Sequence, residues 1–130
     1  MPLVHIVLGL ALAQFLYFGF AVGKARGTYK VSAPATTGNE MFERYYRVQM
    51  NTLELLIILV PTILLFAQYS GAYIAAALGA LYLIGRMIYF VSYVKDPKSR
   101  SVGYGLSALP VIVLLVGTII GAIRAAILTL

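Results

Sequence analysis

A short stretch of the sequence, Phe42 to Glu54, places groups of both charges and an amide in a segment that is otherwise apolar enough to cross a membrane. Arg47, Asn51 and Glu54 follow i, i+4 and i+7 spacing, so a helix presents them on one face. Ionisable groups are rare within membrane spans, and where they occur they mark functional sites. Guanidinium, amide and carboxylate groups together are the partners that a small zwitterionic peptide needs.

A second polar stripe is predicted in the third apolar segment. Tyr82, Arg86, Tyr89 and Tyr93 are spaced by 4, 3 and 4 residues, so they also share one helix face. We expect Tyr82 to pack in the core. Arg86 lies about two turns inside the helix end, and we expect it to be a structural polar residue paired with Glu54.

The composition indicates the kind of protein in which these stripes lie. Of the 130 residues, 62% are hydrophobic and 11% are charged, against about 45–50% and 25% in soluble domains. Four apolar segments, at about 3–22, 40–68, 72–94 and 104–128, are long enough to cross a bilayer as helices. The sequence therefore predicts an all-α integral membrane four-helix bundle, with residues 1–130 forming one domain. With no Cys and one His, we expect neither a disulfide nor a metal site.

The charges predict a topology. Four spans place both termini on one side of the membrane, and two loops, at about 23–40 and 95–100, on the other. Every Lys and Arg except Arg124 lies in or near the loop end, so the positive-inside rule makes the loops cytoplasmic. This placement explains the net charge of +6 without nucleic-acid binding. Asn39 is expected to cap the second helix, with the first helix ending near Val22.

If the two stripes face each other, they form a polar pocket near the loop end. Its predicted residues are Arg26, Arg47, Asn51, Glu54, Tyr89, Tyr93 and Arg100. Arginines bind carboxylates, a glutamate binds an ammonium group and an asparagine binds a peptide amide. Glutathione is an abundant peptide with these groups. A free thiol has a pKa of about 8.5, and lowering it by two units requires about 2.7 kcal/mol, which a nearby arginine can supply. The thiolate would attack a hydrophobic electrophile dissolved in the membrane, with no protein nucleophile.

These motifs resemble those of a known family. Thr36-Thr37-Gly38, Phe42 to Asn51, Glu54, Arg86, Tyr89-Phe90, Tyr93 and Arg100 are similar to the MAPEG family, the membrane-associated proteins of eicosanoid and glutathione metabolism. The resemblance implies a homotrimer with glutathione at the subunit interface. It implies glutathione binding by Arg26, Arg47, Gln49, Asn51, Glu54, Tyr89 and Tyr93, and thiolate stabilisation by Arg100. Gln49 points away from Arg47, so we expect it to contact a neighbouring subunit's ligand or to serve helix packing.

The predicted function is a membrane-bound glutathione transferase, with glutathione peroxidase activity toward lipid hydroperoxides as a side activity. Leu55, Gly27 and Thr52 depart from the leukotriene synthase pattern, which disfavours leukotriene synthesis. Two alternatives stay open. A non-catalytic lipid-binding scaffold of the same family would not ionise the thiol. A small four-span multidrug exporter would carry an acid in its first span, and this first span has none.

Overall fold

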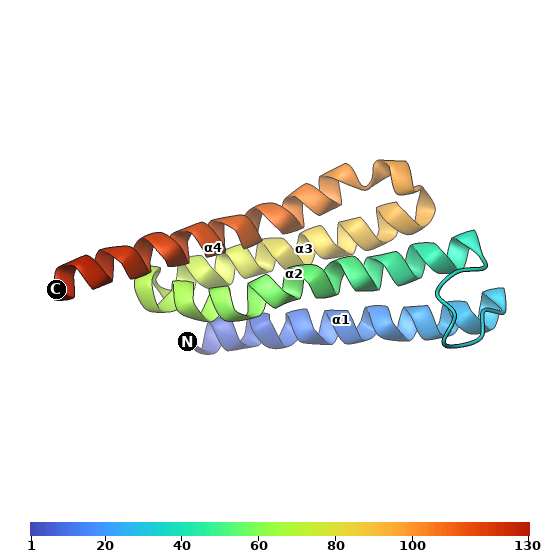
Figure 1. Cartoon of the computed structure of the whole chain (residues 1–130), viewed down its shortest axis with the longest axis horizontal. Coiled ribbons are helices and arrows are strands. Elements are labelled where there is room, and N and C mark those ends of the chain that lie inside the picture. Colours follow the sequence, from blue (N-terminus) through green and yellow to red (C-terminus); the bar gives the residue numbers. More distant parts are fainter.

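A computed structural model describes residues 1–130 as four long helices packed side by side (Figure 1). They are α1 (Pro2–Tyr29), α2 (Glu40–Ser70), α3 (Ala72–Lys95) and α4 (Ser101–Thr129), with a short 3₁₀ helix, η1 (Pro97–Ser99), before α4. All four α-helices are long and apolar enough to cross a membrane. The predicted all-α bundle of membrane-length helices is therefore confirmed. Both termini lie at one end, and the α1–α2 and α3–α4 connections lie at the other (Figure 1).

The first helix is longer than its apolar segment. The prediction that it ends near Val22 is wrong, because α1 continues for two more turns to Tyr29. Val22 and Ala25 remain buried, so the packed face of the helix extends past the apolar run. Lys30 ends the helix in the left-handed conformation (φ 58°). Arg26 therefore belongs to the last turn of α1 and not to a linker.

Two residues fix the ends of α2. The Asn39 side chain accepts a hydrogen bond from the backbone N–H of Phe42 at 3.0 Å, which confirms the predicted N-cap. At the other end, Gly71 is the only residue between α2 and α3. Its φ of 100° is a conformation that side chains disfavour, and it lets the chain reverse direction at once.

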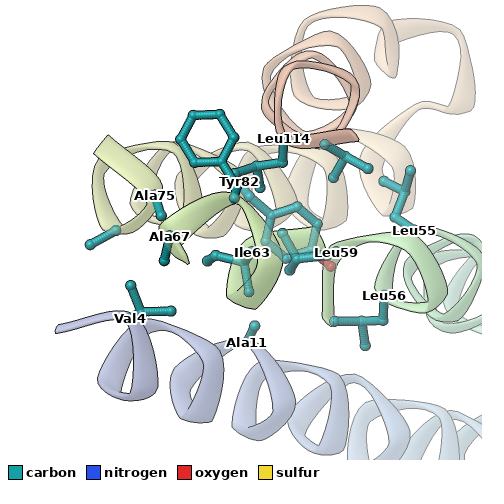
Figure 2. Packing of buried hydrophobic residues seen from close by; sticks show 13 residues of the cluster. Val4, Ala11, Leu55, Leu56, Leu59, Ile63, Ala67, Ala75, Tyr82 and Leu114 are labelled. Carbon is teal, nitrogen blue, oxygen red and sulfur yellow. The ribbon is translucent and has the colours of Figure 1, made fainter. Parts of the chain in front are cut away.

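Apolar side chains from all four helices form the core (Figure 2). Leu59 and Ile63 of α2 are fully buried and are surrounded by Val4 of α1, Tyr82 of α3 and Leu114 of α4. The prediction that Tyr82 packs in the core is confirmed. Many other large apolar side chains point outward, including Phe20, Ile57 and Tyr73. An outer surface of this kind suits lipid and not water.

Small residues bring α3 and α4 into backbone contact beside the polar stripes. A Cβ atom on Gly85 would lie 2.6 Å from the backbone N of Ser107, and one on Gly103 would lie 2.5 Å from the Cα of Tyr89. Such distances require glycine at both positions. This contact places the polar residues of α3 directly against the first turns of α4.

Candidate functional site

A pocket of about 550 Å³ lies near the loop end, between α2, α3 and the first turns of α4. Its size is within the usual range for small-molecule sites. Five of the predicted site residues line it, namely Arg47, Asn51, Tyr89, Tyr93 and Arg100, together with Ser101, Tyr104 and Gly105 of α4. Part of each polar stripe therefore faces one pocket, namely Arg47 and Asn51 of the first stripe and Tyr89 and Tyr93 of the second.

The pocket is electropositive. Arg47 and Arg100 line it, and the N-terminal turn of α4 adds the positive end of a helix dipole. Arg100 donates only one hydrogen bond, to the carbonyl of Pro97 at a long 3.4 Å. The guanidinium of Arg47 lies 3.5 Å from the carboxylate of Glu54, with side chains 52% and 61% exposed. Such a solvated pair is weak, so both arginines are available to an anionic ligand.

The tyrosines are held in place by packing and by a helix cap. The rings of Tyr89 and Tyr93 stack with centroids 5.4 Å apart. Beyond Tyr93, Arg44 of α2 donates to the carbonyls of Val94 at 3.0 Å and Lys95 at 3.3 Å. These bonds satisfy carbonyls that the end of a helix leaves without partners. Arg44 thus fixes the last turn of α3, and with it Tyr93, against α2.

Arg86 has different partners from those expected. The prediction that it pairs with Glu54 is wrong, since Glu54 lies beside Arg47. Arg86 is fully buried and donates to three neutral oxygens, those of Asn51 at 2.7 Å, Thr52 at 3.2 Å and Ser107 at 2.7 Å. The charge of Glu54 suggested this pair, but Arg86 reaches between α2 and α4 while Glu54 points outward. Arg86 therefore joins three helices immediately beside the pocket.

Three of the predicted ligand-binding residues, Arg26, Gln49 and Glu54, do not line this pocket. Glu54 lies next to it, beside the lining residue Arg47. Arg26 donates to the carbonyls of Ala35 at 2.7 Å and Val31 at 3.4 Å, and its guanidinium lies 4.7 Å from the ring centroid of Phe42. Gln49 points toward α1, where a Cβ on Gly19 would lie 3.1 Å from its Nε2. Within one chain, Arg26 holds the α1–α2 connection and Gln49 packs against α1.

Residues of the fourth helix were missed by the sequence analysis. Ser107 is a buried partner of Arg86, and Ser101 and Tyr104 line the pocket. The available signal was the pair Gly103 and Ser107, because small residues four apart favour close helix packing in membranes. That spacing could have placed this face of α4 against α3.

A second pocket, of about 460 Å³, lies along the loop end of α1 and is mainly apolar. One residue of α2 and one of α3 complete its lining. It is lined by Tyr17, Phe20, Ala21, Lys24, Ala25, Thr28, Tyr29, Tyr45 and Phe90. Tyr89 lines the first pocket and the neighbouring Phe90 lines this one. The two pockets thus lie on different sides of the last turns of α3.

Comparison with known proteins adds independent support for the family. The chain matches the model of the MAPEG family over residues 4–120. It is 44% identical over 115 residues to an uncharacterized protein of Synechocystis sp., covering 88% of this chain and 84% of that protein. It is 40% identical over 114 residues to microsomal glutathione S-transferase 2 of Homo sapiens, covering 88% and 76%. It is 37% identical over 84 residues to leukotriene C4 synthase of Cavia porcellus, covering 65% and 56%. With four membrane-length helices and a family match over most of its length, the chain is an integral membrane protein of the MAPEG family.

Proposed function

We propose that this chain is a membrane-bound glutathione transferase that holds glutathione in the pocket between α2, α3 and α4 and activates its thiol as a thiolate. The observation that carries the proposal is the presence of two weakly engaged arginines, Arg47 and Arg100, in one pocket with Asn51, Tyr89 and Tyr93. The similarity to microsomal glutathione S-transferase 2 supports the choice of thiol.

Five of the predicted residues have assigned roles in this mechanism. Arg47 and Glu54 bind the charged ends of the peptide, and Asn51 donates to a peptide carbonyl. Arg100 lies beside the sulfur and stabilises its anion, while Tyr93 orients it. Since a free thiol is only a few per cent ionised at neutral pH, this stabilisation is the main catalytic contribution of the protein.

The reaction needs no group beyond glutathione and the electrophile. The thiol releases its proton to solvent, and the thiolate forms a carbon–sulfur bond as the leaving group departs with the electron pair. Toward a lipid hydroperoxide, the thiolate attacks the terminal oxygen and breaks the O–O bond, forming a sulfenic acid, and the departing alkoxide takes a proton from solvent to give the lipid alcohol. A second glutathione then reduces the resulting sulfenic acid, giving the disulfide and water.

The proposal is tested by thiolate formation. Purified protein titrated with glutathione should give the ultraviolet difference absorbance of a thiolate, and Arg100→Ala should lose most of it. Lys98→Ala is the matched control, because Lys98 is a basic residue of the same loop that does not line the pocket. An Arg100→Ala protein that conjugates a model aryl halide as fast as the parent would remove Arg100 from the mechanism. Binding without thiolate formation in the parent would favour the lipid-binding scaffold.

A homotrimer would complete the site. Arg26 and Gln49 do not line the pocket of their own chain, so any contact they make with glutathione comes from a neighbouring subunit. Arg26→Ala and Arg100→Ala subunits would then complement each other, because a mixed trimer contains some sites with both arginines. Co-expressed subunits should be more active than the sum of the separate variants. Activity no greater than that sum would argue against a shared site.

The basic loop end is proposed to face the cytoplasm, by the positive-inside rule. Because the chain has no cysteine, a Lys98→Cys variant carries a single thiol on the α3–α4 connection. A membrane-impermeant maleimide should label it in inside-out vesicles only. Labelling in right-side-out vesicles would reverse the orientation.

A further inference from the structure

Arg86 carries a buried charge without an acidic partner. It has no exposed surface, and all three of its hydrogen-bond acceptors are neutral. Its Nε has no hydrogen-bond partner. The two ion pairs of the chain join other residues, Arg44 with Glu40 and Arg47 with Glu54. Buried charges are normally paired because desolvation is costly, so an uncompensated one next to a pocket calls for a functional explanation.

This charge lies directly behind the wall of the polar pocket. The guanidinium carbon of Arg86 is 4.2 Å from the ring centroid of Tyr89 and 6.0 Å from that of Tyr104. Both rings line the pocket, as does Asn51, which accepts a hydrogen bond from Arg86. A single layer of side chains therefore separates the charge from the pocket, in a water-poor region where Coulomb interactions are strong.

The same contact sets the orientation of Asn51. A guanidinium only donates hydrogen bonds, so the atom of Asn51 that faces Arg86 at 2.7 Å is the oxygen. The amide nitrogen, with its two N–H donors, is then left for the pocket. The amide of Asn51 could either donate or accept toward the pocket, and its bond to Arg86 makes it a donor there. A donor is what an anionic ligand or a peptide carbonyl requires.

We propose that Arg86 is a positioning residue of the thiol site, whose uncompensated charge lowers the pKa of the bound thiol from behind the pocket wall while its hydrogen bond turns the donors of Asn51 toward the ligand. This inference rests on the proposed function. In this arrangement Arg86 adds a second positive charge to that of Arg100. Unlike Arg100, Arg86 does not contact the ligand. The simpler alternative is that Arg86 only clamps α2, α3 and α4 together.

Thr52 allows the charge to be cancelled without altering the pocket. Its hydroxyl lies 3.2 Å from Arg86, it is fully buried, and it does not line the pocket. In Thr52→Asp a carboxylate would stand beside the guanidinium and stay ionised through that contact. Thr52→Asn is the matched control, equal in size but neutral. Both variants lose the hydroxyl's bond to the carbonyl of Val48, so that loss cancels between them.

The measurement is the pKa of bound glutathione, read from thiolate absorbance against pH at saturating glutathione. We expect Thr52→Asp to raise this pKa by about one unit relative to Thr52→Asn, a roughly tenfold loss of thiolate at pH values below the pKa. Arg86→Gln, where it folds, should shift it in the same direction. Ser107→Ala removes one clamp bond and keeps the charge, so it should lower thermal stability and leave the thiol pKa at the parent value.

Equal thiol pKa values in Thr52→Asp and Thr52→Asn would overturn the inference. So would a Ser107→Ala shift as large as that of Arg86→Gln, because it would assign the effect to the clamp. Failure of the proposed function is recognised separately, since the parent protein itself would then leave the thiol pKa at that of the free thiol, about 8.5.

Discussion

Replacing Glu54 by glutamine tests the proposed recognition of the amino group of glutathione beside Arg47. The geometry gives two contributions of opposite sign to the change in the free energy of glutathione binding. Loss of the carboxylate removes a charged hydrogen bond to the ammonium, about 1.5–3 kcal/mol. It also frees Arg47, which lies 3.5 Å away, but both side chains are more than half exposed, so that pair contributes only about 0–1 kcal/mol.

The difference between these two free energies leaves a net loss of about 0.5–3 kcal/mol, or roughly 2–150-fold weaker binding. Because the ammonium does not take part in the reaction, the interaction is equal in the ground state and the transition state. KM should therefore rise while kcat stays near the parent value.

The assay is a binding isotherm for glutathione in detergent, beside steady-state kinetics with an aryl halide. An analogue without the amino group is the internal control, and it should bind Glu54→Gln at least as tightly as the parent because Arg47 is released. Equal glutathione affinity in the two proteins would refute the assignment. A fall in kcat with unchanged KM would place Glu54 near the reacting sulfur instead.

Three further predictions concern the scaffold, measured as the free energy of unfolding in mixed micelles. Gly103→Ala should destabilise the protein by about 1–3 kcal/mol and impair glutathione binding, because its Cβ would meet the backbone of Tyr89. Gly105→Ala, with no atom within 4 Å of its Cβ, should retain full stability, and equal losses in both variants would exclude the close contact as the cause. Asn39→Ala should lose about 1 kcal/mol, a loss that Asn39→Asp should avoid if capping is responsible. Leu59→Ala, at a fully buried position, should lose about 2–5 kcal/mol, and a loss below 1 kcal/mol would contradict its central place in the core.

The parts of the fold that depend on local chemistry were predictable from the sequence. The four apolar segments determine the helices, and Asn39 identifies the start of α2. The i, i+4 spacing of Arg47 and Asn51 places both in one pocket with Tyr89, Tyr93 and Arg100, whereas Glu54 at i+7 lies outside the pocket lining. In each case the signal lies within one helix or at its end.

Contacts that depend on how different helices pack against one another were not predictable from the sequence. The partners of Arg86 come from two other helices, and charge alone suggested Glu54, which the helix rotation turns outward. The length of α1 was underestimated because its last turns are polar in sequence yet packed against the α1–α2 connection. Arg26 was assigned to the pocket by charge and residue type, whereas its own chain engages it with the carbonyls of Ala35 and Val31.

The single glycine between α2 and α3 makes the two ends of the bundle unequal in their freedom to move. At that end, Gly71 ties the two helices so closely that they cannot separate there without breaking one of them. Near the polar pocket, α1 and α2 are joined by the segment from Lys30 to Asn39, and α3 and α4 by the segment from Asp96 to Arg100. Any separation of α2 from α3 must therefore occur on the side where the arginines lie, so a bulky lipophile that parted these two helices would enter beside the polar pocket.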